Sequence, residues 1–433
     1  GGEVMTVPKL RFKEFDGGWT KSTIQFFMDN NFILDQMDGN HGELYPKSEE
    51  FSATGVPYIS ATDFSFGDVN FATCKRLPIE RAKLFKKGIA KNGDVLFAHN
   101  ATVGPVAILK TDLDFVILST TATYYRCEAT YLNNHYLKNY FESDFFVQQY
   151  FGIMSQSTRN QVPITTQRKL NIAVPNIQEQ TKIASFLSAV DEKISQLTQK
   201  HELLSQYKQG MMQKLFSQQL RFKADDGSEF GEWEEVKFSG IFNFHQTNSY
   251  SRALLAEYGE IMNIHYGDIH TKFSMLFDVN KESVPFLNDE VDTSKIAKEQ
   301  FLKVGDLVIA DASEDYKDIG KSIEVISLNN QKVVAGLHTY IARPVKPFAL
   351  GFCGYMMQTF PVREQIKKLA TGISVLGISK TNLGKVELKV PSLEEQTKIA
   401  NFLSAIDQKI EVVVQQIEQA KTWKKGLLQQ MFV

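Results

Sequence analysis

The chain has 433 residues, enough for about two to four domains, and its 43% hydrophobic and 23% charged residues are typical of folded water-soluble proteins. No apolar run reaches the roughly eighteen residues of a membrane span, and no secretory signal opens the chain. The formal charge of −2 lacks the basic excess of most nucleic-acid binders, so binding to DNA would require positive charge gathered on one face or supplied by a partner.

The first half of the chain divides into three segments. Residues 1–20 contain Leu10-Arg-Phe-Lys13 and, after acidic and glycine residues, Trp19. Residues 21–173 are typical of a mixed α+β domain, because β-branched runs such as Phe115-Val-Ile-Leu118 indicate strands and residues 133–150 have a helical pattern.

Residues 174–216 predict one long helix. Apolar residues recur every seven positions, with others four residues after them, which favours packing against a second helix in coiled-coil fashion. Asn176 and Glu179 have the spacing of a capping box at the start of this helix. About 38 helical residues would extend roughly 57 Å, longer than the roughly 35 Å turn of B-DNA, so such a helix could act as a rigid spacer.

The second half of the chain repeats the first. Residues 217–235 contain Leu220-Arg-Phe-Lys223 and then Trp233, residues 236–389 form a second diverged domain, and residues 390–433 predict a second long helix that begins near Ser392 and Glu395. Residues 174–194 and 390–410 share fifteen of 21 positions, at an offset of 216. The repeat predicts pseudo-two-fold symmetry, with the two chain ends close together.

The two domains between these frames resemble each other only weakly. Lys91-Asn-Gly-Asp-Val-Leu-Phe-Ala98 parallels Lys303-Val-Gly-Asp-Leu-Val-Ile-Ala310, and residues 56–64 loosely parallel residues 261–269. Runs at residues 307–309 and a hairpin-like stretch at residues 332–335 indicate strands, and residues 352–369 have a helical pattern. The predicted fold is therefore α+β, with two mixed domains separated by two long antiparallel coiled-coil helices.

Catalytic and metal-binding motifs are not evident in the sequence. Gly320-Lys-Ser322 suggests a phosphate-binding loop, but Asp315 stands where the first glycine of that motif belongs. The histidines are scattered, and the three cysteines (Cys74, Cys127 and Cys353) lie far apart, as expected of free thiols in a reducing cytoplasm. We therefore expect a protein that is not an enzyme and binds no metal or cofactor itself.

The repeated Pro-x-x-x-Glu-Gln-x-x-Ile-Ala-x-Phe-Leu-x-x-x-Asp-x-Lys-Ile run, at residues 175–194 and 391–410, resembles the shared-region signature of specificity subunits of type I restriction-modification enzymes. The Gly-Asp stretches at residues 93–96 and 305–308 resemble the hallmark strand of that family's target-recognition domains. The resemblance implies a sequence-specific DNA-recognition subunit that reads a bipartite site. It also implies two methylation subunits and restriction/translocase subunits as partners. S-adenosylmethionine, ATP and Mg would be bound on those partners.

Contacts with DNA are expected from cationic residues that hold phosphates and from polar residues on loops that read bases. In the first domain the candidates are Ser60, Thr62, Lys75, Arg76, Lys86, Lys87, His99, Asn100, Thr102, Arg159, Asn160 and Gln161. In the second domain they are His265, Tyr266, Lys272, Ser313, Glu314 and Lys317, with Asp311 on the same loop. Surface lysines are often merely solvated, and Asn100 and Asn160 are equally compatible with turns of positive φ.

Three other functions remain open on the sequence alone. The duplicated helices also permit a coiled-coil scaffold that binds proteins and has no DNA specificity. An enzyme with its own cleaving or methylating activity is disfavoured by the missing motifs. A specificity subunit of another class of restriction enzyme would share the same pattern.

Overall fold

The computed structural model describes residues 7–40, 42–155 and 160–433, and the chain forms two compact units. Unit 1 comprises residues 1–200 and 413–433, and unit 2 comprises residues 201–412. Each unit therefore contains one of the diverged domains, the start of one long helix and the end of the other.

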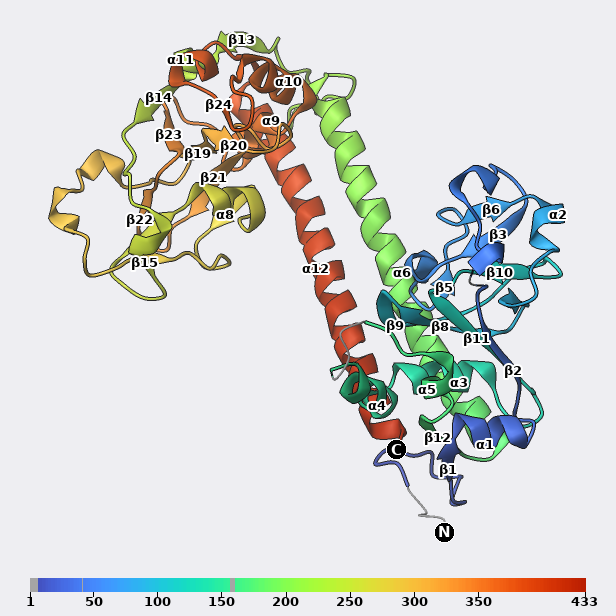
Figure 1. The fold of residues 1–433 in the computed structure, drawn as a ribbon. Helices are drawn as coiled ribbons and strands as arrows, with labels where there is room; N and C mark the ends of the chain where they lie inside the picture. The colour runs from blue at the N-terminus through green and yellow to red at the C-terminus, as the bar shows by residue number, and fades with distance from the viewer. Residues whose placement is uncertain (1–6, 41, 156–159) are drawn as a thin grey trace. The chain divides into compact units, whose positions relative to one another are not determined.

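The long helices α6 (Ile177–Phe216) and α12 (Leu393–Met431) contain 40 and 39 residues and run from one unit into the other (Figure 1). Their predicted apolar stripe is buried. In unit 1, Ile183, Leu187 and Val190 of α6 share a core with Leu427 and Met431 of α12. None of the described helices is long and apolar enough to cross a membrane.

The first domain contains two four-stranded sheets, β2-β11-β8-β9 and β6-β3-β10-β7. Helices α3 and α4 cover the first sheet, so that rings such as Phe97 and Phe141 form the largest core of the unit. The elements of these sheets and their neighbours are β1 (Thr20–Thr23), α1 (Ile24–Asp29), β2 (Ile33–Asp38), β3 (Val56–Ile59), β4 (Phe64–Ser65), β5 (Asp68–Val69), β6 (Lys75–Leu77), α2 (Ile79–Ala82), β7 (Ile89–Ala90), β8 (Val95–Asn100), β9 (Thr102–Ile108), β10 (Val116–Leu118), β11 (Ala122–Cys127), α3 (Asn134–Glu142), α4 (Asp144–Met154), α5 (Ile164–Gln167) and β12 (Asn171–Val174).

The second domain follows the same plan with a larger sheet, β14-β23-β19-β21-β17, and a second sheet, β15-β18-β16-β22. Its elements are β13 (Glu234–Lys237), α7 (Phe238–Ile241), β14 (Phe242–His245), β15 (Leu255–Ala256), β16 (Ile261–Ile264), α8 (Tyr266–Thr271), β17 (Leu276–Asp278), β18 (Phe286–Leu287), β19 (Leu307–Ala310), β20 (Ala312–Ser313), β21 (Ser322–Ser327), β22 (Lys332–Ala335), β23 (Thr339–Pro344), α9 (Phe352–Met357), α10 (Phe360–Leu369), β24 (Leu376–Gly377), α11 (Lys380–Leu383) and β25 (Glu387–Val390). The strand indicated by the hairpin-like stretch at residues 332–335 is confirmed as β22, which pairs in parallel with β16.

The Gly-Asp stretch has a structural role in both domains. Asp94 accepts the Lys91 amide at 2.8 Å and binds the Arg126 guanidinium through both oxygens, at 3.0 and 2.7 Å. Asp306 accepts the Lys303 amide at 2.8 Å and binds Arg343 in the same way, at 2.8 and 2.7 Å. The preceding glycines have φ of +87° and +91°, a conformation that other residues rarely adopt. The motif therefore fastens the turn before a central strand to a neighbouring strand.

The repeated Leu-Arg-Phe-Lys and Trp residues hold the start of each long helix. Glu179 is fully buried, and it accepts bonds from Arg11 at 2.7 Å through both oxygens and from the Trp19 indole at 3.3 Å. In unit 2, Glu395 binds Arg221 and Trp233 in the same way. The Asn176 side chain caps α6 as predicted, at 2.9 Å from the Glu179 amide. In the expected capping box, each glutamate carboxylate would accept the backbone amide of the residue that caps its helix. The carboxylates of Glu179 and Glu395 instead bind arginine and tryptophan side chains.

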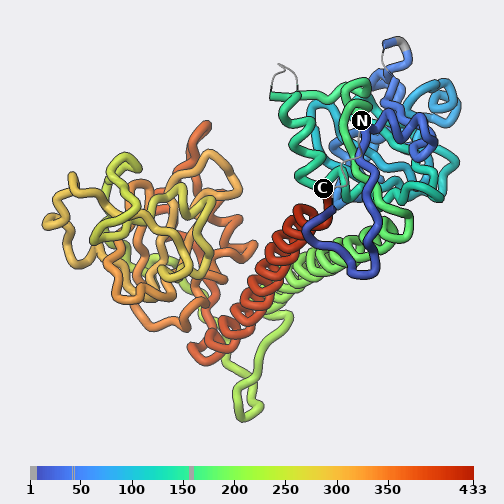
Figure 2. Tube along the Cα trace, turned by 90° about the horizontal axis from the view of Figure 1, so that it is seen from below, coloured from blue at the N-terminus to red at the C-terminus, as the bar shows by residue number. Residues whose placement is uncertain are grey.

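The predicted meeting of the two chain ends is confirmed within unit 1. The Leu10 amide donates to the Gln430 carbonyl at 2.8 Å, and α12 ends beside the segment that follows residue 7 (Figure 2). In unit 2 the equivalent bond joins the Leu220 amide to the Lys214 carbonyl at 3.1 Å. The break between the chain ends thus lies where the other unit has the continuous connection from α6 to residue 220.

Candidate DNA interface

One end of the second sheet of the first domain collects polar side chains. Strands β3 and β10 pair in parallel, so Ser60, which follows β3, and Thr121, three residues after β10, lie at the same end of the sheet. The Thr121 hydroxyl accepts the Ala61 amide at 2.9 Å, and the Thr121 carbonyl accepts the His99 amide at 3.0 Å. Asn100 at the end of β8 forms a bridge with Gln161. We call Ser60, Thr62, Asn100, Thr121 and Gln161 the first polar surface.

Positive charge flanks this surface at the same end of the sheet. Strands β6 and β7 are antiparallel to the central pair, so Lys75 at the start of β6 and Lys87 just before β7 lie beside the ends of β3 and β10. Lys75, Lys86 and Lys87 are exposed, whereas Arg76 donates to the carbonyls of Gly55 and Phe71. The Lys75 ammonium lies 4.8 Å from the centre of the Phe51 ring, and the guanidinium of Arg76 holds a loop.

The second domain has an equivalent set of residues where β16 and β22 end. The Asp311 amide donates to the His338 carbonyl at 3.1 Å, the counterpart of the bond between His99 and Thr121. The His338 ring also lies 3.2 Å from the Asp311 carboxylate and 5.4 Å from the ring of Tyr266. We call His265, Tyr266, Asp311 and His338 the second polar surface.

Several predicted contact residues are buried and act as supports. His99 is 5% exposed, with its ring 2.8 Å from the Thr123 hydroxyl, and Ser313 is 6% exposed, with its hydroxyl bonded to the Asp315 backbone. His265 is 8% exposed and accepts the Gly267 amide at 3.1 Å. Burial and a neighbouring arginine lower the pKa of His265. These side chains shape the two surfaces from within, and only their neighbours are open to solvent.

The remaining candidates are placed as follows. Thr62 and Thr102 are exposed, and Asn160 donates to the Ala101 carbonyl at 2.7 Å. Positive φ occurs at Ala101 (+64°) and not at the neighbouring Asn100. Arg159 lies outside the described residues. Glu314 and Lys317 are exposed on the loop after β20, and Lys272 pairs with Asp268 at 3.2 Å.

Thr121 and His338 were missed by sequence reasoning. They follow strands whose repeat is too weak to align, although Arg126 and Arg343, five residues further on in each case, would have set the register. The described residues contain no group of three or more histidine, cysteine or carboxylate side chains that could hold a metal ion.

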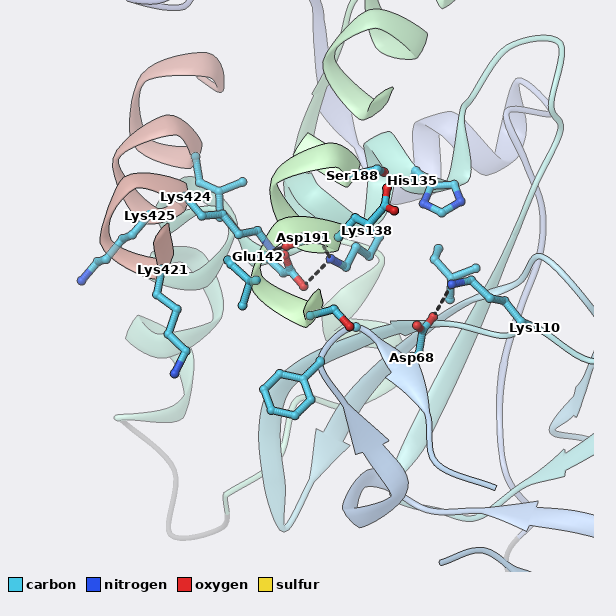
Figure 3. Close-up of a pocket in the computed structure, with 17 residues that line it drawn as sticks. Asp68, Lys110, His135, Lys138, Glu142, Ser188, Asp191, Lys421, Lys424 and Lys425 are labelled. Atoms are coloured by element: carbon cyan, nitrogen blue, oxygen red, sulfur yellow. Dashed lines mark hydrogen bonds and ion pairs between the residues drawn. The ribbon is translucent and has the colours of Figure 1, made fainter. Parts of the chain in front are cut away.

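A pocket of about 550 Å³ lies where the first domain meets the long helices within unit 1 (Figure 3). Its floor is a ring of four charges: Lys138 binds Asp191 at 2.9 Å and Glu142 at 3.0 Å, and Lys424 binds both carboxylates at 2.7 Å. Although burial opposes the charge, the two carboxylates raise the pKa of Lys138, and despite its own burial the two lysines lower the pKa of Asp191. The ring therefore joins α3 of the first domain to both long helices through ion pairs.

The equivalent junction in unit 2 uses a neutral donor. The Tyr355 hydroxyl donates to Asp407 at 2.6 Å, and Lys208 binds the same carboxylate at 2.5 Å. Asp407 and Lys208 lie 216 residues from Asp191 and Lys424, so the junctions differ at Lys138 and Tyr355. Burial raises the pKa of Tyr355, which keeps its hydroxyl protonated.

Lys138→Met is expected to loosen the first domain from the helices by about 1–2 kcal/mol, since Lys424 still pairs both carboxylates. The wild-type ring should weaken at high salt, and it should lose strength as the pH falls through the lowered pKa of Asp191 or rises through the raised pKa of Lys138. Hydrogen exchange of α3 at low and high salt measures this. Tyr355→Phe is the matched variant in unit 2. It should lower the stability of that junction by a smaller amount, about 1 kcal/mol, because the hydrogen-bond donor that it removes is neutral. Equal salt dependence of the two junctions would contradict the assignment.

Comparisons with known proteins agree with this geometry. A family model described as the type I restriction modification DNA specificity domain matches residues 35–206 and again residues 231–422. A putative type I restriction enzyme MjaX specificity subunit of Methanocaldococcus jannaschii is 25% identical over 347 residues, covering 78% of this chain and 76% of that one. The type I restriction enzyme MjaVIII specificity subunit of the same organism is 27% identical over 271 residues, covering 60% of each chain.

Solved structures show the same fold. The S subunit of a type I restriction-modification system from M. genitalium aligns with a TM-score of 0.56 at 16% identity, covering 99% of both chains. A chain from a structure of type I R-M complex assembly and conformational transition also aligns with a TM-score of 0.56, at 17% identity, covering 96% of this chain and 98% of that one. Because the two family matches together cover most of the sequence, the protein belongs to the type I restriction-modification DNA specificity family, and its function is DNA recognition and not catalysis.

Proposed function

We propose that the two polar surfaces each read one half of a bipartite site in double-stranded DNA. The observation that carries this proposal is that one scaffold presents different groups at equivalent positions: Thr121 corresponds to His338, while Ser60 corresponds to His265, which is buried and supports the second surface. Hydroxyl and amide groups of the first surface both donate and accept hydrogen bonds, whereas an ionised Asp311 only accepts them. Base pairs differ in the same pattern of donors and acceptors, so the two surfaces would select different half-sites.

Phosphate contacts would position each surface on the duplex. Lys75, Lys86 and Lys87 flank the first surface, and Lys272 and Lys317 are exposed in the second domain. The chain as a whole carries a formal charge of −2, so further positive charge would come from partner subunits that surround the DNA.

The test is co-expression of the full chain with its methylation subunit, followed by sequencing that maps methyladenine across the host genome. A two-part motif is expected, and exchange of residues 21–173 or 236–389 should change one half only. His338→Ala should relax the second half, costing about 1–3 kcal/mol at the base it contacts, and Thr121→Ala should affect only the first half. A stable complex that methylates without sequence preference would favour the scaffold function instead.

Two equivalent aromatic patches on the helices support two copies of one partner, the methylation subunit. In unit 1, Phe186 packs edge-on against Phe12 at 5.8 Å and against the half-exposed Trp423 at 6.0 Å. In unit 2, Phe222 packs against Phe402 at 5.6 Å. Tyr207, which is 52% exposed, occupies the position equivalent to Trp423. Exposed aromatic side chains of this kind are common anchors of protein interfaces.

Trp423→Ala is expected to weaken the binding of one methylation subunit by about 2 kcal/mol, roughly 30-fold, and Tyr207→Ala the binding of the other. Each variant should shift the complex from two methylation subunits toward one, as measured by native mass spectrometry at limiting concentration. Leu113→Ala, which changes a residue of the first domain that is 46% exposed, is the control and should leave the stoichiometry unchanged. If a variant with both Trp423→Ala and Tyr207→Ala still bound two methylation subunits, the aromatic patches would not be the docking sites.

S-adenosylmethionine, ATP and Mg would be held by the methylation and restriction subunits of the assembly. Cys74, Cys127 and Cys353 are free thiols, which supports work in the reducing cytoplasm where such a complex would meet chromosomal DNA.

A further inference from the structure

A short finger, residues 371–377, projects from the second domain beside the second polar surface. Its base is closed by two hydrogen bonds between Thr371 and Gly377, of 2.9 and 2.7 Å. Gly372 has φ of +130°, and a Cβ there would lie 2.1 Å from the Val375 carbonyl oxygen, so the turn requires glycine. The finger is therefore a defined structure and not an arbitrary loop.

The finger is anchored to the strand that leaves the polar surface. Leu376 and Gly377 pair with Ser313 and Ala312, directly after Asp311. The Ile378 amide donates to the Asp311 carbonyl at 2.9 Å. Leu376 is buried in the core of unit 2, which fixes the base of the finger. Any DNA held against Asp311 would consequently lie within reach of the finger.

The tip of the finger is apolar and fully open to solvent. Ile373 is 102% exposed, the largest value of any large hydrophobic residue in the described part of the chain, and Val375 is 56% exposed. The first domain has the same anchor, because the Val162 amide donates to the His99 carbonyl at 2.8 Å. At the offset of 216, however, its sequence has Ser157 and Arg159 at the two tip positions. An apolar tip is thus a special feature of the second domain.

We propose that Ile373, supported by Val375, contacts the C5-methyl group of a thymine in the major groove of the second half-site. The thymine methyl is the one apolar group that a base edge presents in that groove. An exposed aliphatic tip beside a polar surface can read it without forming a hydrogen bond. The inference rests on the proposed base-reading role of the second polar surface, and it requires at least one A·T pair in the second half-site.

The test compares thymine with uracil, which lacks only this methyl group. The complex of the full chain with its methylation subunits is titrated with duplexes that carry the mapped site, with each thymine of one half-site replaced in turn by uracil. One replacement in the second half-site should weaken binding about three- to five-fold, the value of one buried methyl group. Ile373→Ala should weaken binding of the thymine duplex by a similar factor and bind the thymine and uracil duplexes equally. Uracil in the first half-site should change the affinity of the wild type and of Ile373→Ala by the same factor.

The control is Val304→Ala. Val304 is also aliphatic and exposed (54%), but it precedes β19, whereas Asp311 follows that strand. This variant should keep the full difference between thymine and uracil. The proposed contact is overturned if the second half-site contains no A·T pair, or if uracil in that half-site leaves the affinity unchanged. It is also overturned if Ile373→Ala lowers the affinity for the thymine and uracil duplexes by the same factor, whichever half-site carries the uracil, because loss of a contact with a partner protein would have that effect. If one of these results is found but binding is still sequence-specific, only the Ile373 contact is wrong and the polar surfaces can still read the DNA. Binding without sequence preference would contradict the proposed function itself.

Discussion

Asp94→Ala should selectively destabilise the first recognition domain, by about 3–5 kcal/mol. Asp94 is 2% exposed and holds both the Lys91 amide and the Arg126 guanidinium, so alanine leaves a half-buried positive charge without its main partner. A domain is stable by only about 5–15 kcal/mol, so this is a large share of the total. The melting transition of unit 1 should fall by about 10 °C in calorimetry.

The repeat supplies a matched experiment. Asp306→Ala removes the same contacts from Arg343 and the Lys303 amide in the second domain, and it should lower the transition of unit 2 alone. Hydrogen exchange can assign each loss to its unit by the protection of β8 or of β19. Asp94→Asn keeps an acceptor and should cost less than alanine. If either alanine variant destabilises both units equally, the two domains do not fold as separate units.

The frame of the molecule was predictable because its signals are local or repeated. The heptad stripe of residues 183–215 identified α6, and the offset of 216 identified α12 and the meeting of the chain ends. The role of the Gly-Asp turn was not predictable, because the arginine that binds Asp94 lies 32 residues away on a strand with no motif of its own. The same holds for Glu179, whose spacing suggested a local cap and whose partners lie 160 residues or more away in sequence.

The polar surfaces were only partly predictable for a related reason. Ser60 and His265 follow strands that the weak repeat could align, so their regions were found. Thr121 and His338 reach the same places only through parallel strand pairing, which the sequence does not specify. Burial could not be predicted for other candidates. His99 and Ser313 have polar side chains suited to reading bases, but both are buried and form their hydrogen bonds inside the domain.

Glu179→Ala is expected to release the N-terminal segment from the first helix and to destabilise unit 1 by about 3–5 kcal/mol. The variant removes both bonds to Arg11 and the bond to the Trp19 indole, and it leaves these donors facing a buried site. The segment that starts at residue 7 is otherwise tied to the unit by the bond between Leu10 and Gln430 and by the packing of Phe12 on Phe186, and loss of the Glu179 contacts should expose Lys13 to trypsin. Limited proteolysis followed by mass spectrometry measures the rate of that cleavage.

The control lies in the same segment. Glu14 is half-exposed and pairs with Lys182 at 3.4 Å, and because such exposed ion pairs contribute little to stability, Glu14→Ala should leave the rate of cleavage nearly unchanged. Glu395→Ala removes the equivalent bonds to Arg221 and Trp233, but residues 220–233 are joined to the protein at both ends. The loss of stability should then be similar in unit 2, whereas cleavage at Lys223 should rise less than cleavage at Lys13, because a segment held at both ends gains less freedom when its contacts are lost. Equal cleavage at the two sites would show that the covalent connection contributes little and that the buried glutamate alone holds each segment in place.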